Sequence, residues 1–139
     1  MSEVKGITIK DYSEDVLNEL EDAVKVALKV CGETAETYAK KACPVDTGLL
    51  KNSITYALAG EKPAVSSYKA DKGGGSGSYS GTAPSDGSGS YSVYLGTNVE
   101  YAEIVELGKG QTAQPYISPA IKDHGDKYRQ IIKKYLGGG

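Results

Sequence analysis

The stretch Cys43-Pro44-Val45-Asp46-Thr47-Gly48-Leu49-Leu50-Lys51-Asn52-Ser53 decides how this chain folds. Pro44 must end any helix that precedes it, because the residue before a proline is pushed out of helical geometry. Proline, aspartate and glycine together predict a tight turn. Asp46 or Thr47 can cap a short helical turn through the two leucines, and Gly48 permits a tight backbone. The stretch is therefore expected to form a turn between a helix that precedes it and a strand that follows it.

A long helix is predicted before the turn, from about Ser13 to Ala42. Apolar or small residues recur along it at spacings of three and four and form one stripe. The stripe consists of Val16, Leu20, Val24, Ala27, Cys31, Ala35, Tyr38 and Ala42. Asp11 or Ser13 can cap the start of the helix, and Gly32 in its middle is expected to weaken or bend it. Unbroken, such a helix is about 40 Å long, so it extends along the domain.

The two cysteines, Cys31 and Cys43, lie twelve residues apart in the region of this helix. Twelve helical residues rise about 18 Å, which is beyond the reach of a disulfide. Both thiols are therefore expected to be reduced and packed in the interior, as in a cytosolic protein. With the single histidine, His124, they show no zinc-binding spacing.

Two strands are predicted after the turn. Ser53 to Leu58 alternates between its two faces, which is typical of a half-buried strand. Tyr91 to Leu95 repeats the pattern, so the two strands are expected to pair antiparallel. Between them the pattern is lost, and seven glycines and six serines fill thirteen of the eighteen positions from 73 to 90. Such a segment cannot form a core by itself, so it is expected to project as a loop from one end of the sheet.

Two helices are predicted after the second strand. Asn98 is expected to cap the first, over Val99 to Leu107, and Gly108 to end it. Ser118 is expected to cap the last helix, with Pro119 at its first helical position. Its apolar positions are Ala120, Ile121, Tyr128, Ile131, Ile132, Tyr135 and Leu136.

The order helix, strand, strand, helix, helix predicts an α+β fold. Helices are expected to cover one side of a small antiparallel sheet, with the Gly/Ser-rich loop between the two strands. The chain has 139 residues, which suits one domain and is too short for two. We therefore expect a single domain over 1–139 with a loop insertion at about 59–90.

The composition favours contact surfaces over nucleic-acid binding. Eleven tyrosines stand beside no tryptophan or phenylalanine, and tyrosine suits interfaces as well as cores. The formal net charge is -2 and the pI about 5.4, whereas proteins that grip DNA phosphates are usually basic. Specific nucleic-acid binding is therefore not expected. Neither a secretory signal nor a stretch of the ~20 apolar residues that cross a bilayer is recognised.

Catalytic residues are scarce. His124 is interpreted as a surface residue rather than a general base, and no serine or second histidine completes a nucleophilic or metal-binding arrangement. Glu100, Glu103 and Glu106 fall at three-residue helical spacing, where a carboxylate metal site is conceivable but a solvated acidic face is commoner. The Gly-rich run lacks the lysine of a phosphate-binding loop. We therefore expect no enzymatic activity, no metal and no cofactor.

Three motifs give the chain a resemblance to a known family. The first is Cys43–Ser53, with Pro-Val-Asp-Thr-Gly at its centre. The second is Gly96–Ala102 (Gly-Thr-Asn-Val-Glu-Tyr-Ala) followed by Val105–Gly108, and the third is Gln114–Ala120. In this order, over residues 38–136, they resemble the head–tail joining, or tail-completion, proteins of lambda-like tailed bacteriophages.

The resemblance implies a structural role in the virion, at the neck between head and tail, after assembly in the cytoplasm of a bacterial host. It supplies no catalytic residue. The motif residues are interpreted as determinants of the fold, with Asp46 and Thr47 as caps and Tyr101 packed on the sheet. The set consists of Pro44, Val45, Asp46, Thr47, Gly48, Gly96, Tyr101, Ala102, Gly108, Pro115 and Pro119.

A ring is the expected assembly, because a small subunit buries surface against its neighbours and cyclic symmetry closes such contacts. Six or twelve copies are expected to meet portal, connector, neck or tail proteins. The acidic balance fits a part past which DNA moves during ejection. Two alternatives stay open: a tail terminator that caps the tail tube, and an unrelated small protein-binding regulator.

The loop is where contact with a partner is expected. As a hairpin of two 16-residue arms it would reach about 50 Å. Tyr68, Tyr79 and Tyr91 are interpreted as adaptable anchors, since tyrosine, serine and glycine are favoured in recognition loops. A disordered surface insertion is the alternative interpretation.

Overall fold

The structure is a computed structural model that describes residues 14–85, 91–108 and 112–137, with side chains described from Glu21 onward. It confirms the α+β fold with a long N-terminal helix. The elements in chain order are α1 (Glu14–Ala42), α2 (Leu49–Ser53), β1 (Thr55–Leu58), β2 (Ser67–Lys69), β3 (Ser76–Ser78), β4 (Val93–Gly96), α3 (Ala102–Leu107), α4 (Ile117–Lys122) and α5 (Gly125–Tyr135).

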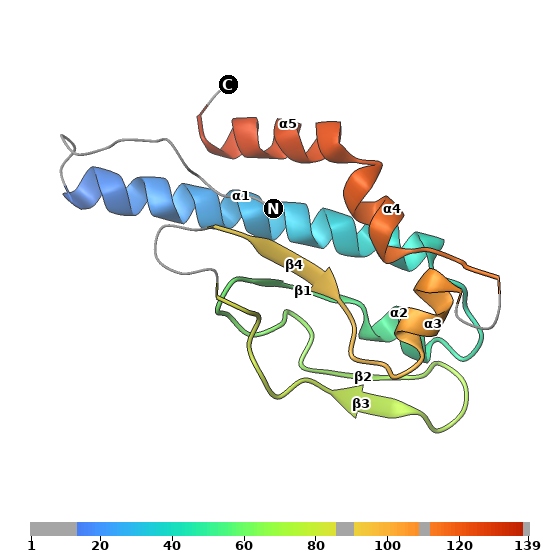
Figure 1. The fold of residues 1–139 in the computed structure, drawn as a ribbon. Coiled ribbons are helices and arrows are strands. Elements are labelled where there is room, and N and C mark those ends of the chain that lie inside the picture. Colours follow the sequence, from blue (N-terminus) through green and yellow to red (C-terminus); the bar gives the residue numbers. More distant parts are fainter. Residues whose placement is uncertain (1–13, 86–90, 109–111, 138–139) are drawn as a thin grey trace.

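Helix α1 lies at the centre of the molecule. Figure 1 shows α4 and α5 along one side of it and the β1–β4 pair along the other. The β2–β3 pair lies farther out, beyond β1. The short helices α2 and α3 gather near the C-terminal end of α1. Since α1 is covered from two sides, it supplies more of the buried hydrophobic residues than any other helix or strand.

The buried face of α1 is wider than the single predicted stripe. Leu28 and Ala39 are buried although the stripe omits them, and Ala42, which it includes, is exposed. A helix packed on two sides buries more of its circumference than an amphipathic surface helix does. Both cysteines are free thiols in the core, which confirms the prediction that they are reduced and packed in the interior. The side chains of Val16 and Leu20 lie outside the described part of the chain.

Gly32 allows the close approach of α1 to the sheet, and the helix continues through it. A Cβ atom built at this position would lie 2.5 Å from Cδ2 of Tyr56 and 2.9 Å from Cγ2 of Val93. No real Cβ tolerates such distances, so the ring of Tyr56 occupies the space that a side chain would need. The position therefore serves helix–sheet packing.

Strands β1 and β4 pair antiparallel as predicted, with Tyr56 opposite Leu95 and Ala57 opposite Tyr94. The prediction of a half-buried first strand is wrong, because Thr55, Tyr56 and Ala57 are all buried. The segment that follows β1 turns back along it. Its Ala64 N–H donates to the Tyr56 carbonyl at 2.9 Å. This loop segment lies along the outer edge of β1, and the sequence pattern does not reveal it.

The Gly/Ser-rich insertion contains regular structure, contrary to the predicted projecting loop. Strands β2 and β3 form an antiparallel hairpin, with Tyr68 opposite Gly77. The hairpin packs beside α2 and lies along the domain in Figure 1. Hydrogen bonds to neighbouring backbone and side chains hold it there, so a strand pair forms in spite of a composition that disfavours a core of its own.

The predicted last helix is divided into α4 and α5. Asp123, His124 and Gly125 interrupt the apolar pattern, and His124 has non-helical backbone angles. Instead of lying free on the surface, the His124 ring is half-buried and stacks on Tyr38 at 3.5 Å between centroids. The Tyr128 hydroxyl donates to the Ala120 carbonyl and so ties α5 to α4.

Two predicted helix caps are also wrong. Asn98 does not cap α3, which begins later, after Tyr101. Helix α4 begins at Ile117, before the predicted Ser118 cap, with Tyr116 at the cap position. Gly108 ends α3 as predicted, with φ of 74° and its N–H bonded to the Ile104 carbonyl.

Candidate interaction surface

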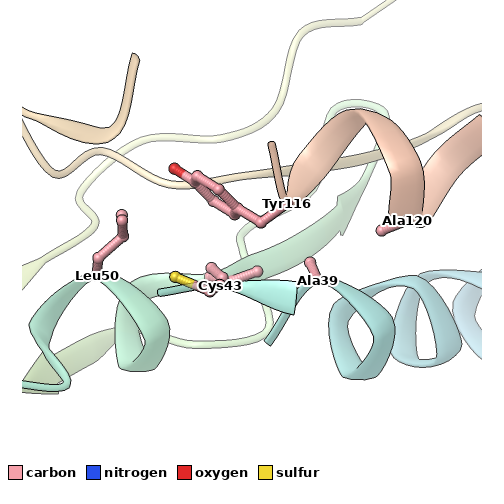
Figure 2. Packing of buried hydrophobic residues seen from close by; sticks show 6 residues of the cluster. Ala39, Cys43, Leu50, Tyr116 and Ala120 are labelled. Carbon is pink, nitrogen blue, oxygen red and sulfur yellow. The ribbon is translucent and has the colours of Figure 1, made fainter. Parts of the chain in front are cut away.

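The three sequence motifs converge on one hydrophobic cluster. Tyr116 from the third motif lies over Cys43 and Leu50 from the first (Figure 2). Ala102 and Val105 from the second motif pack against the same cluster. Tyr116 is only 1% exposed, and its hydroxyl donates to the Ala102 carbonyl at 3.2 Å. Segments that lie far apart in the sequence thus share one core.

The Pro44–Gly48 turn is hydrogen-bonded to the β2–β3 hairpin. The Thr47 carbonyl accepts hydrogen bonds from the backbone N–H groups of Asp71 and Lys72, at 2.8 and 3.0 Å. Gly48 has φ of 87°, and a Cβ atom there would lie 2.5 Å from Oδ2 of Asp71. The Thr47 hydroxyl also accepts from the Leu49 N–H at 3.3 Å, but the cap position of α2 is occupied by Gly48 rather than by Asp46 or Thr47 as predicted. Glycine is required at position 48 both by its backbone angle and by the hairpin that touches it.

The Gly-Thr-Asn segment holds the hairpin from the other side. Asn98 Nδ2 donates to the Ser78 carbonyl at 2.9 Å, and Asn98 Oδ1 accepts from the Tyr68 hydroxyl. The Tyr79 hydroxyl donates to the Ser53 carbonyl and accepts from the Asn98 N–H. These contacts replace the predicted capping role of Asn98.

The three tyrosines assigned to partner contact are engaged within their own chain. Tyr68 and Tyr79 are half-buried, with ring centroids 5.6 Å apart, and both fasten the hairpin. Tyr91 is half-buried and lies in a hollow with Lys25 and Leu28 of α1. Burial raises the pKa of Tyr91 and Tyr68 above the ordinary value of tyrosine. The structure thus gives all three an intramolecular role.

Glu106 connects the second motif to the third. Its carboxylate accepts hydrogen bonds from the N–H groups of Tyr116, Ile117 and Ser118, at 2.9, 2.8 and 3.0 Å. Burial acts to raise the pKa of Glu106, but the three N–H donors outweigh it and the net pKa is lowered. The carboxylate therefore caps the first turn of α4 from a different helix. Sequence reasoning placed Glu106 on a solvated acidic face and missed this role.

The remaining motif residues lie at element ends. Gly96 ends β4 opposite Thr55, and Gly108 turns so tightly that a Cβ atom would lie 2.6 Å from the Ala113 nitrogen. Pro115 is exposed, and Pro119 is the third residue of α4 rather than its first. Tyr101, predicted to pack on the sheet, is instead 40% exposed.

Large apolar side chains remain in contact with solvent on the turn after α1 and on and beside α3. Val45 is 59% exposed and Leu107 60%, and Tyr101 and Ile104 are 40% exposed each. The turn after α1 and helix α3 lie at the same end of the molecule (Figure 1). We call these four residues the α3 surface. An apolar group of this kind on a small domain is typical of a protein–protein contact.

Side chains of the types that bind metal ions do not form a cluster in the described part of the chain. Over residues 14–85, 91–108 and 112–137, no group of three or more His, Cys, Asp or Glu side chains is arranged to hold a metal ion. The described helices also include none that is long and apolar enough to cross a membrane.

The family model of a phage protein matches residues 8–108 of the chain, which includes α1, both sheets and α3. Its description is "Bacteriophage HK97-gp10, putative tail-component". The chain therefore belongs to the HK97-gp10-like family of phage tail components, and so to the proteins of the virion. Neither the curated proteins nor the solved structures contain a match. The third motif and helices α4 and α5 lie beyond the matched residues.

Proposed function

We propose that the chain is a structural, non-enzymatic subunit of a ring at the joint between the head and the tail of a phage particle. Its membership of a family of tail components supports a role among neck and tail proteins. The order of the three motifs, with the resemblance to head–tail joining proteins, supports the position at the joint. DNA passes the ring without specific binding.

The α3 surface is the observation that carries the proposal. Leu107 and Val45 expose more than half of their surface to water in the single chain. Burial of apolar surface contributes about 25 cal/mol per Å², so these side chains favour association. Contacts that join each subunit to the next close into a ring, and six or twelve copies are expected.

Substitution of Leu107 tests the proposal. Leu107→Glu places a charge on the α3 surface and is expected to leave the fold intact, because this side chain is already 60% exposed. Joined particles should become rare in a complementation assay, while free heads and tails accumulate. Gln130→Glu makes the same change of charge at an exposed site on α5 and should leave the yield normal.

Copy number provides the second measurement. Microscopy of the particle neck, or native mass spectrometry of assembled subunits, should find six or twelve copies of the chain in one ring. A chain that is monomeric in every assembly state, or joined particles at full yield with Leu107→Glu, would contradict the proposal.

A tail terminator that caps the tail tube is the second candidate, favoured by the wording of the family description, which names the tail. Cross-linking in intact particles separates the two. A joint protein forms cross-links to portal or connector subunits, whereas a tube cap forms them to tube subunits and is present on tails purified without heads.

A further inference from the structure

Among the described residues, strand β4 pairs with β1 on one side and with no strand on the other. The Ala59 N–H donates to the Ser92 carbonyl at 3.0 Å. In an antiparallel pair every second residue bonds to the partner strand, so Ser92 and each second residue after it bond to β1. By this alternation the N–H and C=O groups of Val93 and Leu95 point away from β1. Between described residues, no backbone hydrogen bond joins these groups to another segment of the chain. The outer edge of β1 differs, since Ala64 already bonds to it.

An apolar groove accompanies the open edge. Val93 and Leu95 line it together with Gly32 of α1 and with Ile121 and Ile132 of α4 and α5, and its volume is about 130 Å³. Ile121 on its rim is 48% exposed. The groove therefore offers backbone hydrogen bonds on one wall and apolar side chains on the others, which is what an added β-strand requires.

A segment of matching pattern lies at the start of the sequence. Gly6-Ile7-Thr8-Ile9-Lys10 alternates polar and apolar residues over five positions, which is typical of a half-buried strand. The two isoleucines have the same two-residue spacing as Val93 and Leu95. Placed opposite those residues, Ile7 and Ile9 would direct both side chains into the groove. This segment lies outside the described residues.

We propose that residues 6–10 of one subunit add as a strand to the β4 edge of the next subunit. The inference rests on the proposed ring and names the contact that closes it. Each subunit gives a strand on one side and receives one on the other, which is a heterologous, head-to-tail contact. The pairing also covers an edge that would otherwise promote aggregation.

The length of the chain favours a second copy as the donor. Val93 contacts α1 at Gly32, and the 18 helical residues from Glu14 to Gly32 span about 27 Å. Five extended residues from Glu14 back to Ile9 cover at most about 18 Å. Ile9 therefore falls about 9 Å short of Val93 in its own subunit, and Leu95 lies farther along α1 still.

Amide hydrogen exchange of the full-length protein tests the contact directly. The amides of Val93 and Leu95 should exchange freely in dilute monomer and at least about tenfold more slowly after assembly. Ile7→Ser with Ile9→Ser should abolish both assembly and this protection. Thr8→Ser with Lys10→Ser, which changes the opposite face of the same segment, should preserve them.

Mixing two variants tests the direction of the contact. Val93→Pro removes the outward N–H without breaking the ladder to β1, where proline is tolerated on an edge strand. Alone, this variant and the double serine variant should each remain monomeric. The Val93→Pro variant keeps an intact residue 6–10 segment, and the double serine variant keeps an intact β4 edge. Their mixture should therefore form heterodimers and no ring. Native mass spectrometry distinguishes these species, and circular dichroism checks that both variants fold.

Three results would overturn the inference and are distinguishable from one another. A ring in which the Val93 and Leu95 amides exchange as fast as in the monomer leaves the proposed function standing and refutes the strand contact. Protection that is already complete in dilute monomer would show that the chain covers its own edge. Absence of any assembly would refute the ring and the strand contact together.

Discussion

Single residues in this protein serve contacts between distant segments, and Gly48 shows this most directly. It combines a φ of 87° with a neighbouring Asp71 side chain that a Cβ atom would approach to 2.5 Å. The sequence motif therefore encodes a docking site for the hairpin in addition to a turn.

Substitutions of three glycines separate the two requirements. Gly73→Ala, with φ of 82° and open space around it, should destabilise the fold by about 1–2 kcal/mol through its backbone angle alone. Gly48→Ala should cost at least about 1 kcal/mol more, because Asp71 must move. Gly74→Ala has open space and no positive φ and should be nearly neutral. Urea unfolding measures all three, and equal effects at 48 and 73 would contradict the role of Asp71.

Glu106 acts at the same scale, and its contribution depends on pH. A carboxyl whose folded-state pKa lies below its ordinary value of 4.5 stabilises the fold above that value, and the stabilisation is lost as the pH falls through the lowered pKa. Glu106→Gln should therefore cost about 1–3 kcal/mol at neutral pH, and the difference from the unmodified chain should shrink below about pH 4.5.

Unfolding curves between pH 3 and 7 measure this difference. The exposed Glu100 on the same segment provides the matched control, and Glu100→Gln should change stability by less than about 0.5 kcal/mol. A Glu106→Gln effect that is constant across the pH range would argue against an ionised cap on α4.

At the scale of elements, the close packing of α1 on the β1–β4 pair depends on Gly32. Alanine raises helix propensity by about 1 kcal/mol over glycine, but the added methyl would overlap the buried Tyr56 ring, and overpacking of this kind costs about 1–3 kcal/mol. We expect Gly32→Ala to lower the stability of the whole chain while it raises the helicity of an isolated peptide of residues 14–42.

Thr37→Ala is the matched control for helix propensity, since Thr37 is exposed on the same helix. It should raise the helicity of the peptide without destabilising the whole chain. If Gly32→Ala stabilises the whole chain as well, the approach of α1 to the sheet is looser than the Gly32–Tyr56 distance indicates.

At the scale of the whole molecule, the two thiols report on global unfolding. Burial raises the pKa of Cys43 to about 11, with Lys51 lowering it and Glu106 raising it by smaller amounts. At pH 8 only about one thiol in a thousand would then be ionised. Cys31 is also buried, and burial raises its pKa as well. Both should resist thiol reagents at pH 8 until the chain unfolds.

Labelling with an aromatic disulfide reagent measures this resistance. The free energy of unfolding from the labelling rate should agree with that from urea. Ser80→Cys adds a thiol at an exposed position that should react at once in the folded chain. Rapid labelling of Cys31 or Cys43 under native conditions would mean that the core around Tyr116 opens locally.

The sequence sufficed where the deciding signals are local. The long helix, the Pro44 turn, the antiparallel pairing of the two strands and the end of α3 at Gly108 all follow from periodicity and turn chemistry. The hairpin at β2 and β3 could not be predicted, because its stability comes from Asn98 and Thr47, which are distant in sequence. Glu106 was missed for the same reason: the amides that it binds lie ten to twelve residues further along the chain.

The position of α1 between two layers also sets the order in which the protein can fold during synthesis. The helix leaves the ribosome early, but the residues of α5 that cover one of its sides follow about 80 residues later, which takes roughly 4–16 s at about 5–20 residues per second. Until Ile131 and its neighbours arrive, the apolar side of α1 around Cys31 stays open to water. A nascent chain therefore passes through a stage in which the sheet side is complete and the helix still lacks its outer cover, and during that interval chaperone binding would protect it most.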